Sequence, residues 1–486
     1  MSIRIVLKYL GPLMGVLAAA FAIPLACSLA YGDGVASAFI VPALVAGLVG
    51  AGLWLLVPLD RRSLSRREGL ALVTITWIAG SLIGALPYTL SGVLPAYTDA
   101  VFETMSGFTT TGATVFTSIG DQPASILLWR NFSQWLGGMG IITLFVAFFP
   151  VLGVGAARIF EAEMPGPQPE RLRARIRGTA RTLWLTYCGF SAAELLLLVS
   201  FGSLPVYDAL NVTFATMPTG GFLHLEQSIG AYADNVFVTT VVTAFMLLAG
   251  VNFALYYYYM RRGRDISVIA RNPEFRLYAG IFLVATALIV FDLVTRAGYA
   301  IGSALQHGAF QVATILTTTG FTTTDYDVWP TLSRGVLLVL MIVGASAGST
   351  GGGLKVVRLL VLAKYAFRQV VSAFRTRSVM FVKVGGQVVP DATVSSVLGM
   401  AILYVFTLGV GYLVLSGLGI ESTTAFSAVA ATTGNVGPGL AGVGPTQNYM
   451  FIPAFGKIVL TLCMLVGRLE FVTAMALLTP AFWHWR

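Results

Sequence analysis

Residues 99–113 read DAVFETMSGFTTTGA, and the same pattern occurs three more times along the chain. The other copies are DALNVTFATMPTGGF at 208–222, HGAFQVATILTTTGF at 307–321 and ESTTAFSAVAATTGN at 421–435. Aligned without gaps, each copy begins with an acidic residue or histidine and has a glycine thirteen positions later: Gly112, Gly221, Gly320 and Gly434. Four copies of one stretch predict four versions of one structural unit.

The composition is that of a membrane protein. Of the 486 residues, 56% are hydrophobic and only 10% are charged, and the mean hydropathy is +0.82. Apolar runs of about 20 residues, the length that crosses the hydrocarbon of a bilayer as a helix, recur along the whole chain. We therefore predict an all-α polytopic membrane protein, embedded in the lipid bilayer, rather than a set of soluble domains.

The net charge of +9 would also suit a nucleic-acid-binding protein, but the placement of the charges indicates membrane orientation instead. Twenty-five of the 30 Lys and Arg residues fall in connections that alternating spans would place on one side. The positive-inside rule makes that side cytoplasmic, and both termini are expected on it. No nucleic acid partner is expected. The three cysteines lie in apolar runs without metal-ligand spacing and indicate no redox compartment: Cys27, Cys188 and Cys463.

Every copy of the repeated stretch lies between two apolar runs, so each unit reads as span, re-entrant stretch, span. Two spans per unit restore the starting side, which predicts parallel repeats. Two further spans, at 5–31 and 36–58, precede the units, and the first has no cleavage site and is expected to be retained. The expected organisation is a two-span region at 1–68 and repeats at 69–160, 161–265, 266–370 and 371–486.

The repeated stretch has the properties of a pore loop. Its first ten residues are mostly apolar and form about two and a half helical turns, too short to span a membrane. Thr and Gly follow, and non-helical backbone at membrane depth is tolerated only where protein buries it or it lines a watery cavity. In a pore loop, backbone carbonyls replace the hydration shell of an ion. Ordinary turns between spans are the alternative for one copy, but four copies in register favour cation permeation.

Motifs beyond the loops resemble the Trk/Ktr/HKT superfamily of potassium transporters, and specifically its TrkH-type potassium-translocating subunits. They are QWLGGMGII at 134–142, AEMPGP at 162–167, TTGFTTTDYDVWP at 318–330, NVGPGL at 435–440 and GRLEFVTAMALLTPAFW at 467–483. The two leading spans match the extra pair of TrkH-type proteins. The resemblance implies four parallel span–pore-loop–span repeats around one pseudo-fourfold pore. It also implies uptake of K⁺ across a bacterial inner membrane, with no organic cofactor.

In this superfamily a glycine in each loop belongs to the selectivity filter. The resemblance therefore implies that K⁺ passes the following residues: Thr110, Thr111 and Gly112; Thr219, Gly220 and Gly221; Thr318, Thr319 and Gly320; Thr432, Thr433 and Gly434. A serine at the first of the four glycine positions accompanies sodium preference in some relatives, so Gly112 favours potassium. The fourth loop departs from the family pattern, because TrkH-type proteins often have Asn where this chain has Gly434.

A glycine-rich stretch, GASAGSTGGG at 344–353, lies in the middle of the third unit's closing span. Each glycine in a helix costs about 1 kcal/mol relative to alanine, so a continuous helix is unfavourable here. The spacing of a Walker phosphate loop is absent. A packing kink is one interpretation, and the resemblance favours the other, an intramembrane loop that obstructs the closed pore. The gate would then comprise Gly344, Gly348, Gly351, Gly352 and Gly353, together with Lys355 and Arg468.

Arg468 lies well inside an apolar run, where a charge is costly and usually pairs or faces a cavity. It either pairs with Glu470, snorkels to the cytoplasmic edge, or faces the pore beside the glycine-rich stretch as a cation barrier or clasp. Lys355 either acts in the same place or anchors the membrane edge. Three other basic residues are expected to pack at the outer rim or to pair with loop acids: Arg130, Arg334 and Lys457.

The three histidines are scattered, and the acidic residues of the spans are isolated in sequence, so we expect no enzyme. The resemblance further implies a homodimer and a cytosolic RCK/KTN-type nucleotide-binding regulatory subunit on the basic loops. Nucleotide control would come from that partner, since no nucleotide-binding domain is recognised in this chain. Within transport, the alternative is a sodium-permeable protein or a proton- or sodium-coupled potassium symporter.

Overall fold

The computed structural model describes residues 2–58, 65–148, 172–261, 263, 265–374, 380–471, 477 and 479–484. These residues form helices joined by loops, with one two-stranded hairpin of β1 (Lys383–Val384) and β2 (Gln387–Val388). Six helical segments are long and apolar enough to cross a membrane, and α11 with α12 would make a seventh. The prediction of a helical, multi-pass membrane protein is confirmed. The motif at 162–167 and part of the motif at 467–483 lie outside the described residues.

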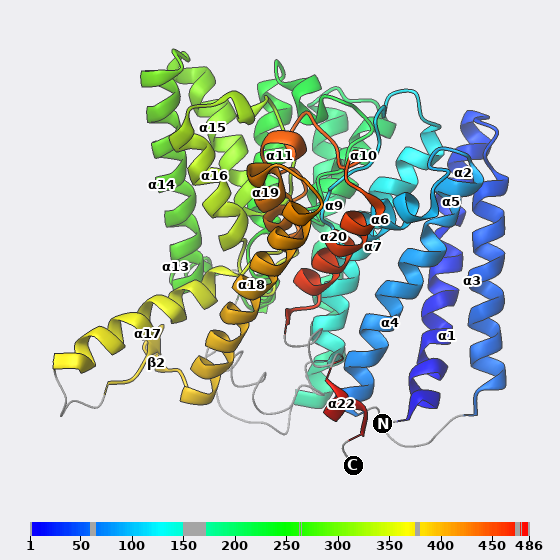
Figure 1. Ribbon diagram of the computed structural model, residues 1–486, viewed down its shortest axis with the longest axis horizontal. Helices are drawn as coiled ribbons and strands as arrows, with labels where there is room; N and C mark the ends of the chain where they lie inside the picture. The colour runs from blue at the N-terminus through cyan, green and yellow to red at the C-terminus, as the bar shows by residue number, and fades with distance from the viewer. Residues whose placement is uncertain are drawn as a thin grey trace.

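The two leading spans pack tightly against each other. They comprise α1 (Ile3–Ala20), which continues into α2 (Ala22–Tyr31), and α3 (Ser37–Leu56). A Cβ atom built on Gly11 or Gly50 would lie under 3.0 Å from the carbonyl oxygen of the other, so these glycines allow the close approach. The ammonium group of Lys8 donates to the carbonyl of Val57 at 2.9 Å and thereby caps the end of α3. Figure 1 shows this pair at one edge of the molecule.

The remaining helices repeat one order, in which a long helix is followed by a short helix and then by a returning helix. In the first half these are α4 (Arg66–Gly84) with α5 (Leu86–Leu90), α6 (Tyr97–Phe108) and α7 (Ala124–Phe148), then α9 (Leu172–Ser200), α10 (Val206–Thr216), η1 (Ser228–Tyr232), α11 (Val236–Ala249) and α12 (Phe253–Arg261). The short helices α6 and α10 lie in the upper half of the molecule in Figure 1.

The second half follows the same order after the short connecting helix α13 (Ser267–Ala270). Its elements are α14 (Pro273–Arg296), α15 (Ile301–Leu316), η2 (Tyr326–Val328), α16 (Thr331–Val343) and α17 (Val356–Phe374), then α18 (Asp391–Gly417), α19 (Ser422–Thr433), η3 (Ala441–Val443), α20 (Ala454–Arg468) and α22 (Pro480–His484). Figure 1 shows the start of α1 and helix α22 on the same side of the molecule. The boundaries at 68, 160, 265 and 370 remain predictions.

The short helices form the buried centre, while large apolar side chains face outward. All but one of the residues 424–433 of α19 are buried, and most of them are Ala, Ser or Thr. On the long helix α14, by contrast, Leu283, Val284 and Phe291 are among the most exposed side chains. A small-residue interior with an apolar exterior is the arrangement expected where lipid, not water, surrounds the protein.

Two returning helices are broken at membrane depth. The glycine-rich stretch interrupts the third one, as predicted, and separates α16 from α17, which runs away from the body in Figure 1. The returning segment of the second unit is also broken, because α11 and α12 meet at an angle of 88°. The break lies at 250–252, where the Asn252 side chain accepts the amide of Ala254 at 2.9 Å and starts a new helix.

Candidate functional site

Each short helix ends in a loop, and the four loops share one backbone conformation. We define loop 1 as 109–113, loop 2 as 218–222, loop 3 as 317–321 and loop 4 as 434–438. In the first three loops, a threonine with positive φ is followed two residues later by a glycine with positive φ. These pairs are Thr110 and Gly112 (52° and 82°), Thr219 and Gly221 (56° and 79°), and Thr318 and Gly320 (60° and 84°).

Loop 4 has the same conformation, but three residues later than the gap-free alignment predicts. Gly434 has φ −77° and ends α19 in the ordinary helical region, so it does not occupy the position of the other three glycines. Asn435 (φ 54°) takes the place of the threonine, and Gly437 (φ 99°) takes the place of the glycine. Thr432 and Thr433 are the last residues of α19. The predicted alignment of Thr432, Thr433 and Gly434 with Thr110, Thr111 and Gly112 is therefore wrong.

Backbone hydrogen bonds confirm this register. In loop 1 the amide of Thr110 donates three residues back to Gly107, and the next amide, Thr111, donates five residues back to Ser106, at 2.9 and 2.8 Å. The matching pair in loop 4 is Asn435 to Thr432 and Val436 to Ala431, at 3.2 and 2.8 Å. Loops 2 and 3 repeat both bonds.

The four loops contact one another in a closed cycle. Each positive-φ glycine lies against the carbonyl of the residue that precedes the corresponding glycine in the next loop, so that a Cβ atom built on it would lie under 3.0 Å from that oxygen. The contacts run from Gly112 to Gly220, from Gly221 to Thr319, from Gly320 to Val436 and from Gly437 back to Thr111. Four backbone segments, distant in sequence, therefore form one ring in which no side chain fits at the glycine positions.

The fourth unit joins the first through polar contacts as well. The side-chain amide of Asn435 donates to the hydroxyl of Thr111 at 2.9 Å. The ammonium of Lys457 on α20 pairs with Asp99 on α6 at 2.8 Å, and both side chains are largely buried. The amide of Tyr449 donates to the carbonyl of Thr114 at 2.8 Å. These contacts close the ring between the two ends of the repeated region.

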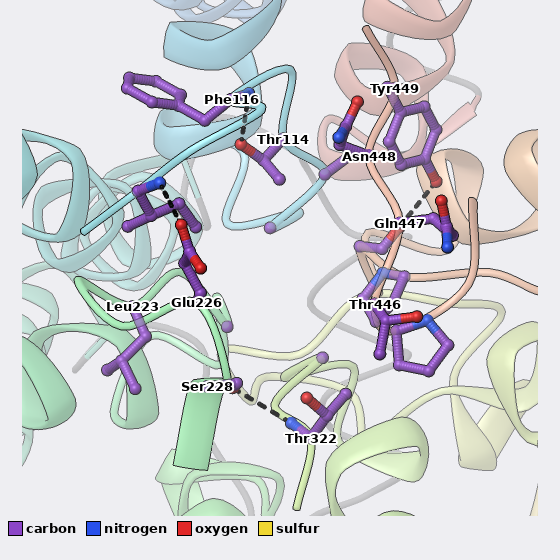
Figure 2. A pocket seen from close by; sticks show the side chains of 18 of the residues that line it. Thr114, Phe116, Leu223, Glu226, Ser228, Thr322, Thr446, Gln447, Asn448 and Tyr449 are labelled. Atoms are coloured by element: carbon purple, nitrogen blue, oxygen red, sulfur yellow. Dashed lines mark hydrogen bonds between the residues drawn. The ribbon is translucent and has the colours of Figure 1, made fainter. Parts of the chain in front are cut away.

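A cavity of about 200 Å³ opens on one side of the ring, and all four positive-φ glycines line it. Figure 2 shows side chains that follow each loop around this cavity, including Phe116 after loop 1, Glu226 after loop 2, Thr322 after loop 3 and Tyr449 after loop 4. The Tyr449 hydroxyl donates to the carbonyl of Gly437 at 2.7 Å and holds loop 4 from the outside. Backbone and polar side chains therefore surround an entrance to the ring.

A buried ion pair ties loop 1 to loop 2. Glu103 on α6 accepts from Arg130 on α7 at 2.6 Å, and their side chains are 0% and 2% exposed. Glu103 also accepts the backbone amide of Val115 at 2.8 Å, just after loop 1. Arg130 donates to the carbonyl of Leu223 at 2.8 Å and covers the ring of Phe222 at 3.7 Å, just after loop 2. One charged pair therefore holds the backbone on the outer side of two loops.

The glycine-rich stretch lies directly against the inner side of the ring. The amide of Gly352 donates to the hydroxyl of Thr318 in loop 3 at 2.7 Å. The hydroxyl of Thr350 donates to the carbonyl of Met217, next to loop 2, at 3.1 Å. The break between α11 and α12 supports the same stretch, because the amide of Phe253 donates to the carbonyl of Gly348 at 3.0 Å. Gly344, Gly348 and Gly353 have positive φ, which only glycine adopts without strain.

Two cations and one carboxylate bind this stretch. Arg468, 4% exposed, donates to the carbonyl of Thr350 at 2.6 Å, and Lys355 donates to the carbonyl of Gly351. Buried Glu274, at the start of α14, accepts the amide of Ala347 at 2.6 Å. Glu470 pairs instead with Arg358 at 2.7 Å, so Arg468 neither pairs with Glu470 nor snorkels to the edge. Arg468 therefore lies beside the glycine-rich stretch, and its role there as a cation barrier or clasp stays a prediction.

The three other basic residues pair with acids: Arg130 with Glu103 and Lys457 with Asp99, both acids being on the short helix α6, and Arg334 with Asp327 of η2 at 3.8 Å. Glu103, Glu274 and Asn252 are functional candidates that the sequence pattern did not predict. Glu103 and Glu274 each carry a charge next to an apolar run, and that signal could have marked them. Asn252 carries no comparable signal in a single sequence. No group of three or more His, Cys, Asp or Glu residues that could hold a metal ion occurs in the part of the chain that the structure describes.

Comparisons with known proteins agree with this geometry. Residues 37–483 match the TrkH family, described as cation transport protein. The chain is 37% identical over 489 residues to the Trk system potassium uptake protein TrkH of Salmonella typhimurium, with 100% of both chains covered. It is 31% identical over 484 residues to the Trk system potassium uptake protein TrkG of Escherichia coli, with 99% of both covered.

Among solved structures, the potassium transporter TrkH from Vibrio parahaemolyticus matches with a TM-score of 0.91 and 34% identity, with 100% of both chains covered. The similarity in sequence and in fold therefore extends over the whole length, and not over a shared segment. The family consists of transporters and not of enzymes. The chain belongs to the TrkH family of cation transport proteins.

Proposed function

We propose that this protein takes up K⁺ through the ring of four loops. The closed cycle of glycine–carbonyl contacts carries the proposal, since it brings four carbonyl-rich segments to one place and excludes side chains from it. Carbonyl oxygens at such a site replace the water that the ion loses. The names of the relatives, which are potassium uptake proteins at 31% to 37% identity, support the choice of ion.

The filter would comprise Thr110, Thr111 and Gly112, Thr219, Gly220 and Gly221, Thr318, Thr319 and Gly320, and, in loop 4, Asn435, Val436 and Gly437. The short helices end at the loops, so their negative ends lie near the ring and favour a cation. Four span–loop–span units of parallel orientation would surround this single pathway. The common order of long, short and returning helices supports that arrangement.

The glycine-rich stretch would close the pathway below the filter. Its contacts with loops 2 and 3 support this role, as do buried Arg468 and partly buried Lys355, whose positive charges repel K⁺ in the same place. Gly344, Gly348, Gly351, Gly352 and Gly353 would form the gate, with Lys355 and Arg468 as clasps. Opening would require these bonds to break, so the gate has a defined closed position.

The protein would act in a bacterial inner membrane, with both termini in the cytoplasm. Its basic connections would lie on the cytoplasmic side by the positive-inside rule. A homodimer and a cytosolic RCK/KTN-type nucleotide-binding subunit would complete the system, and the basic residues of those connections suit a docking site for the latter.

The test is K⁺ uptake by potassium-starved cells that lack other uptake routes. Expression of the wild-type chain should restore growth and K⁺ accumulation, and Gly112→Ser should weaken the preference for K⁺ over Na⁺. Absence of rescue by the wild type, at normal abundance in the membrane, would overturn the proposal. Ion-replacement flux in proteoliposomes separates a potassium channel from a sodium-permeable protein or a coupled symporter.

A further inference from the structure

Loop 2 differs from the other loops at the position before its positive-φ glycine. Loops 1 and 3 have threonines there, and each of them exchanges a hydrogen bond with the threonine two residues earlier: Thr111 with Thr109 at 2.7 Å, and Thr319 with Thr317 at 2.8 Å. Loop 4 has Val436 at this position. Loop 2 has Gly220 and therefore lacks a side chain that could hold it in place.

The amide of Gln134, on α7 of the preceding unit, occupies the space of that missing side chain. A Cβ atom built on Gly220 would lie under 3.0 Å from three atoms of the Gln134 amide group. The Gln134 side chain is fully buried. Its Nε2 donates to the carbonyl of Gly220 at 2.6 Å, and its Oε1 accepts the backbone amide of Phe222 at 3.1 Å. The two bonds bracket Gly221, the positive-φ glycine of loop 2.

An amide satisfies both partners, whereas an ionised carboxylate satisfies only one of them. The carbonyl of Gly220 needs a donor, and the amide of Phe222 needs an acceptor, so the orientation of the Gln134 side chain is fixed by its neighbours. An ionised glutamate of the same shape would still accept the amide of Phe222, but it would place a second acceptor against the carbonyl of Gly220 in place of the donor. The same Gly220 carbonyl lies against Gly112, so a shift of loop 2 would also change its contact with loop 1.

The neighbouring residues of α7 suit this role. A Cβ atom on Gly137 would lie under 3.0 Å from the carbonyl of Phe108, next to loop 1, and one on Gly138 would lie under 3.0 Å from Pro218 in loop 2. The two glycines therefore let α7 approach both loops closely. The indole of Trp135 donates to Ser191 at 3.1 Å and fixes the opposite side of α7 to α9. The motif QWLGG thus places the Gln134 amide behind the ring.

We propose that Gln134 is a positioning residue for ion selectivity, which replaces from a neighbouring unit the side chain that Gly220 lacks. The inference rests on the proposed potassium permeation. Gln134 would not touch the ion, and it would act through the position of the Gly220 carbonyl and of Gly221. The predicted consequence is a change in the preference for K⁺ over Na⁺ when the amide is altered without a change of shape.

The experiment measures the permeability ratio of K⁺ to Na⁺ for purified protein in proteoliposomes, and Gln134→Glu is the first variant. The loss of a buried hydrogen bond should lower the ratio about tenfold, a free-energy change of about 1.4 kcal/mol. Gln134→Ala should lower it similarly. The matched control is Asn131→Ala, which removes a buried amide from the same helix. The Asn131 side chain donates to Asn211 at 2.6 Å and, within the described residues, has no hydrogen bond to the four loops, so this variant should keep the wild-type ratio.

Substitution of Gly220, alone and together with Gln134, tests the packing of these two residues against each other. Gly220→Ala should lower the ratio, because the new Cβ atom collides with the Gln134 amide. In Gly220→Ala/Gln134→Ala that collision is absent, so the permeability ratio of the double variant should be no lower than that of Gln134→Ala alone. If the two defects multiply, the residues act independently and the inference is wrong.

The abundance of each variant in the membrane distinguishes a folding defect from a change in ion selectivity. A wild-type ratio in both Gln134→Glu and Gln134→Ala overturns the inference, and so does an equal loss in Asn131→Ala. If Gln134→Glu does not reach the membrane, Gln134→Ala and the double variant carry the decision by the same criteria. Failure of the wild type itself to transport K⁺ is a different result, because it refutes the proposed function and not this role of Gln134.

Discussion

Replacement of Arg468 by alanine should open the pathway in the absence of any regulatory partner. Arg468 donates from a buried position to the carbonyl of Thr350 at 2.6 Å, in the middle of the glycine-rich stretch. The bond holds that stretch against loops 2 and 3, in the arrangement that we propose to be closed. Its loss should therefore raise the open fraction, and removal of the positive charge should lower the barrier to K⁺ as well.

The magnitude follows from the type of bond. A hydrogen bond from a charged group contributes about 1.5 to 3 kcal/mol, which corresponds to about 10- to 150-fold in the equilibrium between open and closed states. The flux should rise by this factor until the open fraction approaches one. Lys355, which binds the adjacent carbonyl of Gly351, remains in the variant and keeps part of the restraint. Arg468→Ala/Lys355→Ala should therefore leak more than either single variant.

The assay is Rb⁺ tracer uptake by proteoliposomes that contain only the purified protein. Arg296→Ala is the control, since Arg296 is 63% exposed, pairs with Asp292 on the same helix and has no bond to the glycine-rich stretch. Its flux should equal that of the wild type. An unchanged or lower flux in Arg468→Ala, with normal incorporation into the vesicles, would refute the role of Arg468 as a clasp.

Three further predictions address the ring and its support. Gly437→Ser should reduce the preference for K⁺, measured by uptake in competition with Na⁺, as strongly as Gly112→Ser, because a Cβ atom at either position meets a carbonyl of the next loop. Gly434→Ser should affect the abundance of the protein but not its preference for K⁺. The reverse result would restore the gap-free register. Glu103→Gln leaves the Arg130 charge buried without its partner and should cost about 3 to 5 kcal/mol of stability, measured by thermal unfolding in detergent. The double variant Glu103→Gln/Arg130→Met should cost less. Equal or additive losses of stability would argue against a coupled pair. The exposed carboxylate of Glu421 accepts the backbone amides of Thr423 and Thr424, and these bonds lower its pKa from the ordinary 4.5 to about 2. The stabilisation by this cap should therefore be present above pH 4.5 and disappear as the pH falls toward 2. The difference in thermal stability between the wild type and Glu421→Ala should shrink with acidification, and a constant difference would contradict this.

The sequence predicted the helical membrane fold, the short helices followed by non-helical loops, and the break at 344–353, because each of these leaves a local signal. Apolar runs identify spans, and glycines that collapse helix propensity identify breaks. Three loops were also placed in the correct register, since Thr110, Thr219 and Thr318 precede a glycine by two residues in each copy. The local pattern and the structure agree wherever the backbone conformation depends on the residues of the loop itself.

The predicted register of the fourth loop was wrong for a physical reason. Asp99 and Asp208 are the third residues of their helices, but Glu421 is the cap that precedes α19. Both positions favour a carboxylate, so the acidic residues aligned while the helices did not. The resulting shift of three residues placed Gly434 opposite the other glycines. Asparagine adopts the left-handed conformation readily, and Asn435 followed by Gly437 therefore serves where the other loops have threonine and glycine.

The contacts of buried polar residues could not be predicted from one sequence. Gln134, Glu103 and Glu274 act on segments that are distant in the chain or on neighbouring helices. Their partners depend on which helices meet, and the periodicity of a single helix carries no such information. The 88° bend between α11 and α12 is an example, because its only signals are one glycine and one asparagine within an apolar run.

The closure between the last and the first unit has a consequence for synthesis at the ribosome. Asn435 bonds to Thr111 and Lys457 pairs with Asp99 across 324 and 358 residues of sequence. Until these C-terminal residues enter the membrane, loop 1 and the first turn of α6 lack their partners, and buried Asp99 has no counter-charge. A nascent chain therefore passes most of its translation with an incomplete ring, and a chain that terminates before Asn435 would expose unpaired polar groups to lipid. Quality control of membrane proteins that detects such groups would remove truncated chains before they could leak ions.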